Sequence, residues 1–263
     1  MLKKVKFIYT DRRYRIALVL LLVWLAATSN FGAERALPTV AAAALTATVL
    51  DFSINYLFRK LTYFPISGLV SGLLVGLIID PHSGYAPVIA AAILAVLSKH
   101  VLSYQGPHIR NHIFNPAAFG VVAVSVAYGN LSAWWGVSWW PGIYLLLIPT
   151  AGYIIYKMGR VPLVLSFLAL YAAYKFVLTG DPISSVLSPL DATTIFFALV
   201  MLPEPQSSPA TGIWKYGFGI LVGIILILTG RYPDLALDPL LLSLLAADLL
   251  SFAVNKVNPT LQT

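Results

Sequence analysis

Hydrophobic residues gather along the chain in ten segments that are separated by brief polar joints. In a window of about 20 residues, the length an α-helix needs to cross a bilayer, the segments cover residues 16–31, 37–58, 64–79, 85–104, 113–128, 141–156, 161–177, 183–202, 213–230 and 235–254. Several are short, and Pro or Gly interrupts them. Because the joints leave no room for a soluble domain, the pattern predicts an all-α integral membrane protein with about ten transmembrane helices.

Composition points to lipid as the solvent of this chain. Hydrophobic residues make up 59% of the sequence and charged residues 10%, whereas soluble domains carry about 25% charged residues. Small residues such as Ser67-Gly68 and Ser71-Gly72 suit close helix packing in lipid. The chain has no cysteine, which excludes disulfides, thiol catalysis, thiolate zinc sites and iron–sulfur ligation by this polypeptide. A redox role therefore requires an organic cofactor or a partner protein.

Six prolines recur in the same order about half a chain later, which indicates a duplicated unit. Pro38, Pro65, Pro81, Pro87, Pro107 and Pro116 correspond to Pro162, Pro189, Pro205, Pro209, Pro233 and Pro239. Two pairs keep a polar neighbour: Asp80-Pro81 matches Glu204-Pro205, and Asn115-Pro116 matches Asp238-Pro239. Since each unit holds an odd number of segments, the units 16–130 and 131–257 are predicted to be inverted five-helix repeats. A basic segment, 1–15, precedes them and a tail, 258–263, follows.

Lysines and arginines test this topology independently. If all ten segments cross and the N-terminus is cytoplasmic, fourteen of the seventeen lie on the cytoplasmic side, and only Arg35, Lys175 and Arg231 lie outside. This bias predicts cytoplasmic N- and C-termini in the cell membrane. It also accounts for the net charge of +7 without nucleic acid as a partner. Trp134, Trp135, Trp139 and Trp140 are then expected in an aromatic belt at the outer interface, rather than as a platform for a ligand.

Three carboxylates fall inside hydrophobic segments, where a charge is costly. These are Asp51, Asp191 and Asp248. The functional interpretation is a cation or proton path, or polar contacts to a bound cofactor. The structural alternative is a packed carboxyl that pairs with a lysine or a backbone amide.

The residues before the repeated prolines allow two interpretations as well. Proline disfavours helix at its predecessor, so Asn115 and Asp238 are candidates for a binding site at helix breaks, and the alternative is helix capping. For Asp80 and Glu204, capping is the expected role. His108 and His112 have the i, i+4 spacing of metal or haem ligands on a helix. Pro107 opposes a helix there and no third ligand is near, so a basic loop is expected and no metal site is predicted.

Several runs of residues resemble a known membrane family. They are SGLVSGLLVGLIIDP, HIFNPAAFG, GRVPLVLSFLALY, DATTIFFALVMLPEPQSSPATGIWKYGFG and GRYPDLALDPLLLSLLAADLL. They resemble the family shared by the RnfD protein of the Rnf electron-transport complex and the NqrB protein of the sodium-translocating NADH:quinone oxidoreductase. The resemblance covers nearly all the chain from Phe64 onward, and its most specific pieces are FNPA at Phe114 to Ala117 and the aromatic-acid-proline hairpin Phe196 to Gly219. It implies a ten-helix bundle of inverted repeats similar to urea transporters, bound flavin, and partner subunits that couple electron transfer to sodium or proton translocation.

One departure from this family concerns the flavin. Its members attach FMN covalently to a threonine between the FNPA helix and the sixth span, but here that interval is YGNLSAWWGVSWWPG, which has no threonine. A covalent FMN is therefore not expected, and the resemblance implies a noncovalent flavin (FMN or riboflavin) or a quinone, with Asn115, Pro116, Thr193, Thr194 and Asp238 as cofactor-binding candidates. Two other functions stay open: a small-solute channel or carrier without redox chemistry, and a structural scaffold in a larger complex.

Overall fold

The structure, a computed structural model, describes residues 11–105, 110–138, 141–208, 212–232 and 236–257. The protein is all-α, with 77% of its residues in helices. The helices are α2 (Arg12–Phe31), α3 (Ala33–Arg59), α4 (Ile66–Ile78), α5 (Tyr85–Val101), α6 (Pro116–Tyr128), α7 (Ile143–Lys157), α8 (Val161–Thr179), α9 (Pro182–Leu187), α10 (Ala192–Phe196), α11 (Trp214–Thr229) and α12 (Pro239–Val257). Short 3-10 helices η1 (Pro81–Ser83) and η2 (Ser188–Leu190), a π-helical turn η3 (Phe197–Met201) and a small antiparallel pair, β1 (Ser103–Gln105) and β2 (Arg110–His112), join them.

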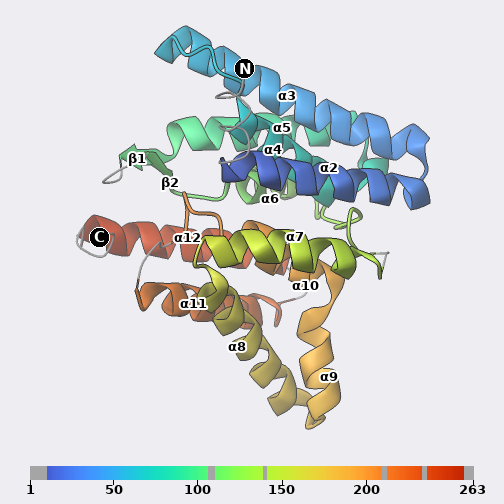
Figure 1. Cartoon of the computed structure of the whole chain (residues 1–263), viewed down its shortest axis with the longest axis vertical. Helices are drawn as coiled ribbons and strands as arrows, with labels where there is room; N and C mark the ends of the chain where they lie inside the picture. The colour runs from blue at the N-terminus through green and yellow to red at the C-terminus, as the bar shows by residue number, and fades with distance from the viewer. Residues whose placement is uncertain (1–10, 106–109, 139–140, 209–211, 233–235, 258–263) are drawn as a thin grey trace.

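Figure 1 shows that the two halves of the chain form two layers. Helices α2 to α6 lie in one layer and α7 to α12 in the other. At the boundary, α2 contacts α7 and α6 contacts α12. The hydrophobic core is continuous across this boundary and contains buried residues from both halves.

Glycines on one face of α4 bring α4 and α3 into backbone contact. A Cβ atom added to Gly68, Gly72 or Gly76 would lie 2.9 Å or less from atoms of α3. The nearest of these include Ala47 O, Ala43 O and the Cα of Val40. This is the close approach through small residues that membrane helices use. We call this contact the α3/α4 glycine seam.

The predicted segment 183–202 is broken. It consists of α9 with η2 and of α10 with η3, and the two pieces are bent by 55°. Pro189 falls at the break, and the carboxylate of Asp191 caps the second piece by accepting hydrogen bonds from the N–H groups of Thr193 and Thr194. A proline cannot continue the hydrogen bonding of a helix interior, and a capping aspartate starts a new helix.

Two helices of the described residues, α3 and α8, are long and apolar enough to cross a membrane by length and composition, and the bent pair is a third if it counts as one span. The other apolar helices are shorter. The 13 residues of α4 and of α6 extend about 20 Å, whereas a bilayer core is about 30 Å thick. The fold is thus that of an all-α protein with the apolar helices of a membrane protein.

Candidate functional site

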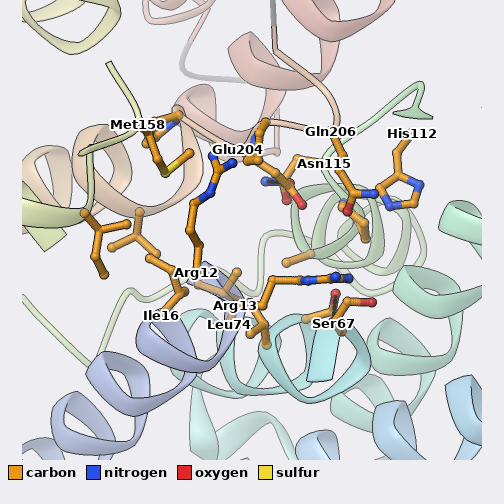
Figure 2. A pocket seen from close by; sticks show the side chains of 18 of the residues that line it. Arg12, Arg13, Ile16, Ser67, Leu74, His112, Asn115, Met158, Glu204 and Gln206 are labelled. Carbon is orange, nitrogen blue, oxygen red and sulfur yellow. Dashed lines mark hydrogen bonds between the residues drawn. The ribbon is translucent and has the colours of Figure 1, made fainter. Parts of the chain in front are cut away.

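A cavity of about 270 Å³ lies between the two halves of the chain. Residues from α2, α4, α5, α6, α7 and η3 line it, together with the turn that follows η3. One part of its wall is polar and consists of Asp11, Arg12, Arg13, Ser67, Ser71, Lys99, His112, Asn115, Glu204 and Gln206. The rest is apolar and consists chiefly of Ile16, Val70, Leu74, Ile154, Ile155, Met158, Leu199 and Val200. Figure 2 shows the side chains of Arg12, Asn115 and Glu204 directed toward the open space.

Asn115 joins two carboxyl groups beside this cavity. Its Nδ2 donates to Glu204 Oε2 over 2.6 Å, and its backbone N donates to Asp248 Oδ2 over 2.8 Å. Its Oδ1 accepts from the N–H of Ala118 and caps α6, which starts with Pro116 at its first position. Capping and site contact, the two alternatives for Asn115, therefore occur together in one residue. We call Asn115, Glu204 and Asp248 the Asn115 cluster.

Behind the cluster, two buried oxygen atoms have no hydrogen-bond partner. They are Asp248 Oδ1 and Ser207 Oγ. The Ser207 hydroxyl lies near the Asp248 carboxyl, without the geometry of a hydrogen bond. Asp248 is only 1% exposed. Buried polar atoms in folded proteins are almost always paired, so an orphan carboxyl oxygen in the core requires an explanation.

Glu204 lies in the turn after η3, at the end of a predicted membrane segment. Burial raises its pKa to about 7, although the nearby charge of Lys99 lowers it. On the same wall, burial and the charge of Lys99 lower the pKa of His112 to about 4, so this imidazole is neutral at pH 7. The charge of Glu204 on the cavity wall therefore changes near neutral pH.

A buried ion pair forms the opposite part of the polar wall. Lys99 Nζ donates to Asp51 Oδ2 over 2.5 Å and to Ser67 Oγ over 2.6 Å. His100 Nε2 lies 2.7 Å from Asp51 Oδ1, and Asn55 Nδ2 donates to the same oxygen. Asp51 is thus a packed carboxylate whose charge a lysine compensates. Gly68 of the glycine seam lies directly against its side chain.

Asp238 belongs to a separate polar cluster. Its Oδ2 accepts from Trp134 Nε1 over 2.6 Å and from Ser132 Oγ over 2.8 Å, and its Oδ1 caps α12. Asp248, which contacts Asn115, lies ten residues further along α12, a rise of about 15 Å. The two X-Pro polar residues therefore do not share one site in this structure.

The remaining predicted site residues lie partly at helix starts and partly on the cavity wall. Asp191 is an exposed cap of α10, which gives it the backbone-amide partners of the structural alternative. Thr193 and Thr194 are in the first turn of α10 and do not line the cavity, whereas Asn115 and Pro116 do. Asp80 caps η1 through the N–H of His82, as expected. For Glu204 the expectation of capping is wrong, because its side chain accepts from Asn115 instead.

The expected aromatic belt is wrong for Trp134 and Trp135. They are 5% and 1% exposed, and their indole N–H groups donate to Asp238 Oδ2 and Gly76 O. Trp139, Trp140 and His108 lie outside the described residues. His112 lies in β2, in agreement with the expectation that this region is not helical.

The cavity meets part of what a flavin or quinone needs. Arg12 brings positive charge that suits an anionic group, whereas Arg13 is paired with Asp11 and Lys99 with Asp51. The apolar wall suits a ring. The volume of about 270 Å³ is just below the range of about 300 to 1,000 Å³ of small-molecule pockets. The described lining contains no Phe, Tyr or Trp. In the part of the chain that the structure describes, no three His, Asp or Glu residues are grouped as metal ligands.

Comparison of the sequence with models of protein families and with curated proteins finds no match. The resemblance to the Rnf and NADH:quinone oxidoreductase proteins is therefore carried by the sequence motifs alone.

Proposed function

We propose that the protein is a membrane-embedded subunit of an ion-translocating electron-transport complex of the Rnf type. In this proposal, the cavity holds a noncovalent flavin or a quinone, and carboxyl groups beside it assist the passage of sodium ions or protons. The observation that carries the proposal is the cavity itself. It lies where Asn115-Pro116 of one half meets the turn after η3 of the other half, and it combines a polar wall that carries Arg12 with an apolar one. Transporters place their sites at such helix breaks between repeats.

The proposed architecture is ten crossings in two inverted five-helix repeats, similar to urea transporters. Several contacts support it. The two X-Pro pairs start α6 and α12, and these helices touch each other at the boundary between the layers. In the first half α3 contacts α5, and in the second half α8 contacts α11, which are the corresponding segments. The charge bias of the sequence then assigns both termini and the mouth of the cavity to the cytoplasmic side of the cell membrane.

The residues of this chain have distinct tasks in the proposal. Arg12 binds the phosphate of FMN or another anionic group, since arginine matches phosphate oxygens with paired donors. Ile154, Leu199 and Val200 exclude water from the ring. A bound flavin or quinone supplies the electron chemistry, because the polypeptide has no thiolate and so no iron–sulfur ligands of its own. Partner subunits supply the remaining redox centres.

An optical spectrum of the purified protein tests the proposal directly. We expect flavin absorbance and fluorescence, with the flavin released on denaturation. If the purified protein is colourless, it should be titrated with FMN, riboflavin and a short-chain quinone. We expect Arg12→Gln to weaken FMN binding about tenfold or more, since a charge-assisted hydrogen bond contributes about 1.5–3 kcal/mol. Arg231→Gln, which removes an exposed arginine away from the cavity, is the matched control. Absence of all three bindings would refute a cofactor in this cavity.

A second candidate is a carrier or channel for a small solute, without redox chemistry. The size of the cavity and the lack of aromatic side chains in its described lining favour it. Protein in liposomes would then accelerate the flux of a small neutral solute while binding no flavin. A colourless protein that neither binds cofactor nor moves solute would leave the scaffold role, in which it only holds partner subunits together.

A further inference from the structure

We propose that Glu204 and Asp248, bridged by Asn115, form a proton-binding acid pair, in which Asp248 keeps a proton and Glu204 exchanges one with the cavity. The proposal deepens the ion-passage part of the proposed function, because it names the proton as the ion and the Asn115 cluster as its site. Its basis is the hydrogen bonding and burial of these three residues.

Asn115 holds the two carboxyl groups in a fixed geometry. One asparagine donates to both carboxyl groups, through Nδ2 to Glu204 and through the backbone N to Asp248, over 2.6 and 2.8 Å. Asn115 itself is 1% exposed and is fixed by its cap on α6. Two carboxyl groups held by one rigid residue repel each other when both are ionised, so one of them is favoured in its neutral form.

The Asp248 carboxyl has no positively charged partner among the ion pairs of the described residues. Asp51, another buried carboxylate of the helix layers, is paired with Lys99 and His100. Asp248 is equally buried, yet none of the ion pairs among the described residues includes it, and its Oδ1 has no hydrogen-bond partner. An isolated carboxylate in an apolar interior is so unfavourable that it takes up a proton instead. The orphan oxygen is then the place of that proton.

The side chains of the cluster suit a proton better than a metal cation. They supply two carboxyl groups, those of Glu204 and Asp248, with the Ser207 hydroxyl near Asp248. Within the described residues no group of three acidic or histidine side chains is available to enclose an ion. Hard cations in proteins collect about six oxygen ligands, whereas a proton needs one oxygen and one acceptor.

Glu204 connects this interior site with the cavity. The charged and titratable groups that line the cavity with it or interact with it are Asp11, Arg12 and Arg13 at the start of α2, Lys99 on α5, His112 on β2, and Asp248 on α12. Its pKa of about 7, raised by burial and lowered in part by Lys99, lets it take up a proton from cavity water close to neutral pH. The proton forms an O–H bond at the Glu204 carboxylate and leaves hydroxide or water behind, so no electron is transferred.

Infrared difference spectroscopy of the purified protein during a pH titration tests the pair. We expect the C=O band of a protonated carboxyl to appear with a midpoint near pH 7, to vanish in Glu204→Gln and to persist in Glu34→Gln. Glu34 is the other glutamate of the chain and is exposed. In the absolute infrared spectra, a second such band should be present at every pH and be lost in Asp248→Asn. Retention of the titrating band in Glu204→Gln would overturn the proposal.

Two further arms distinguish the alternatives. Because Asp248 is neutral in the proposal, Asp248→Asn should leave the midpoint of Glu204 in place, and a clearly lower midpoint would show that Asp248 carries a charge and overturn the assignment. Replacing K⁺ by Na⁺ at constant ionic strength should not move the midpoint, and a fall of the midpoint with Na⁺ would identify a sodium site instead. The bands report on the carboxyl groups whether or not flavin binds, so failure of the cofactor proposal leaves this result independent.

Discussion

Removal of the Lys99 ammonium from the cavity wall is expected to destabilise the protein strongly. In Lys99→Met the apolar stem is kept, but Asp51 loses the donor at 2.5 Å and stays buried with His100, Asn55 and Ser67 as its remaining partners. Breaking a buried ion pair on one side costs about 3–5 kcal/mol. Since three partners remain, we expect a loss of about 3 kcal/mol.

The matched control is Lys157→Met. Lys157 is exposed and lies 5.6 Å from the centre of the Tyr153 ring. Such a contact contributes about 0.5–1 kcal/mol, so the free energy of unfolding should change by less than about 1 kcal/mol. The assay is equilibrium unfolding in mild detergent with a denaturing detergent, followed by tryptophan fluorescence.

The double variant Asp51→Asn with Lys99→Met completes the cycle. Because it removes the uncompensated charge, it should be less destabilised than the sum of the two single variants, with a coupling of about 1–3 kcal/mol. The reasoning fails if Lys99→Met costs no more than Lys157→Met, or if the double variant shows additive losses. Either result would mean that the contact contributes little in the folded protein.

Three other predictions concern packing, pH and capping. Gly120→Ala should lose about 1–3 kcal/mol in thermal unfolding, because its Cβ would lie 2.3 Å from a backbone oxygen of α5, whereas Gly152→Ala, with nothing within 4 Å, should be neutral or slightly more stable. Folding raises the pKa of Glu204 from 4.5 to about 7. The free energy of unfolding should therefore fall as the pH rises from about 4.5 to about 7. Glu204→Gln should flatten that slope, and an unchanged slope would contradict the pKa. Asp238→Ala should lose roughly 2–4 kcal/mol, because a cap and the partner of a buried indole disappear, against about 0.5–2 for Asp181→Ala, where only a cap is lost. Equal losses in the two variants would contradict this.

The all-α fold could be predicted from the sequence because a long apolar segment in lipid must pair its own backbone N–H and C=O groups, which an α-helix does. The segment 161–177 is a helix almost as predicted, in α8. Hydropathy could not reveal the break in the segment 183–202, since both of its pieces are apolar. The signals for it were Pro189 and Asp191, a proline beside a capping residue, and they indicate the end of one helix and the start of another.

The residues of the candidate site could be predicted only in part. Asn115 was predicted as a site candidate from its place before a proline, and it does line the cavity. Its partner Glu204 was assigned to capping, because a residue before a proline at a segment end is usually a cap. The contact that gives Glu204 its role joins residues 89 positions apart. Asp238 has the same local pattern as Asn115, yet its neighbours are Ser132 and Trp134, so only tertiary contacts separate their environments.

The glycine seam between α3 and α4 has a consequence for how the cavity can change through evolution. Where helices touch through their backbones, no side chain can be shortened or rotated to make room, so the backbones of α3 and α4 keep a fixed spacing. The cavity itself is bounded by side chains that can be exchanged for smaller or larger ones, such as Val70 and Leu74 on α4 and Ile154 and Ile155 on α7. New ligand preferences would therefore arise by substitution of these side chains, while the seam keeps the backbone of α4 in place.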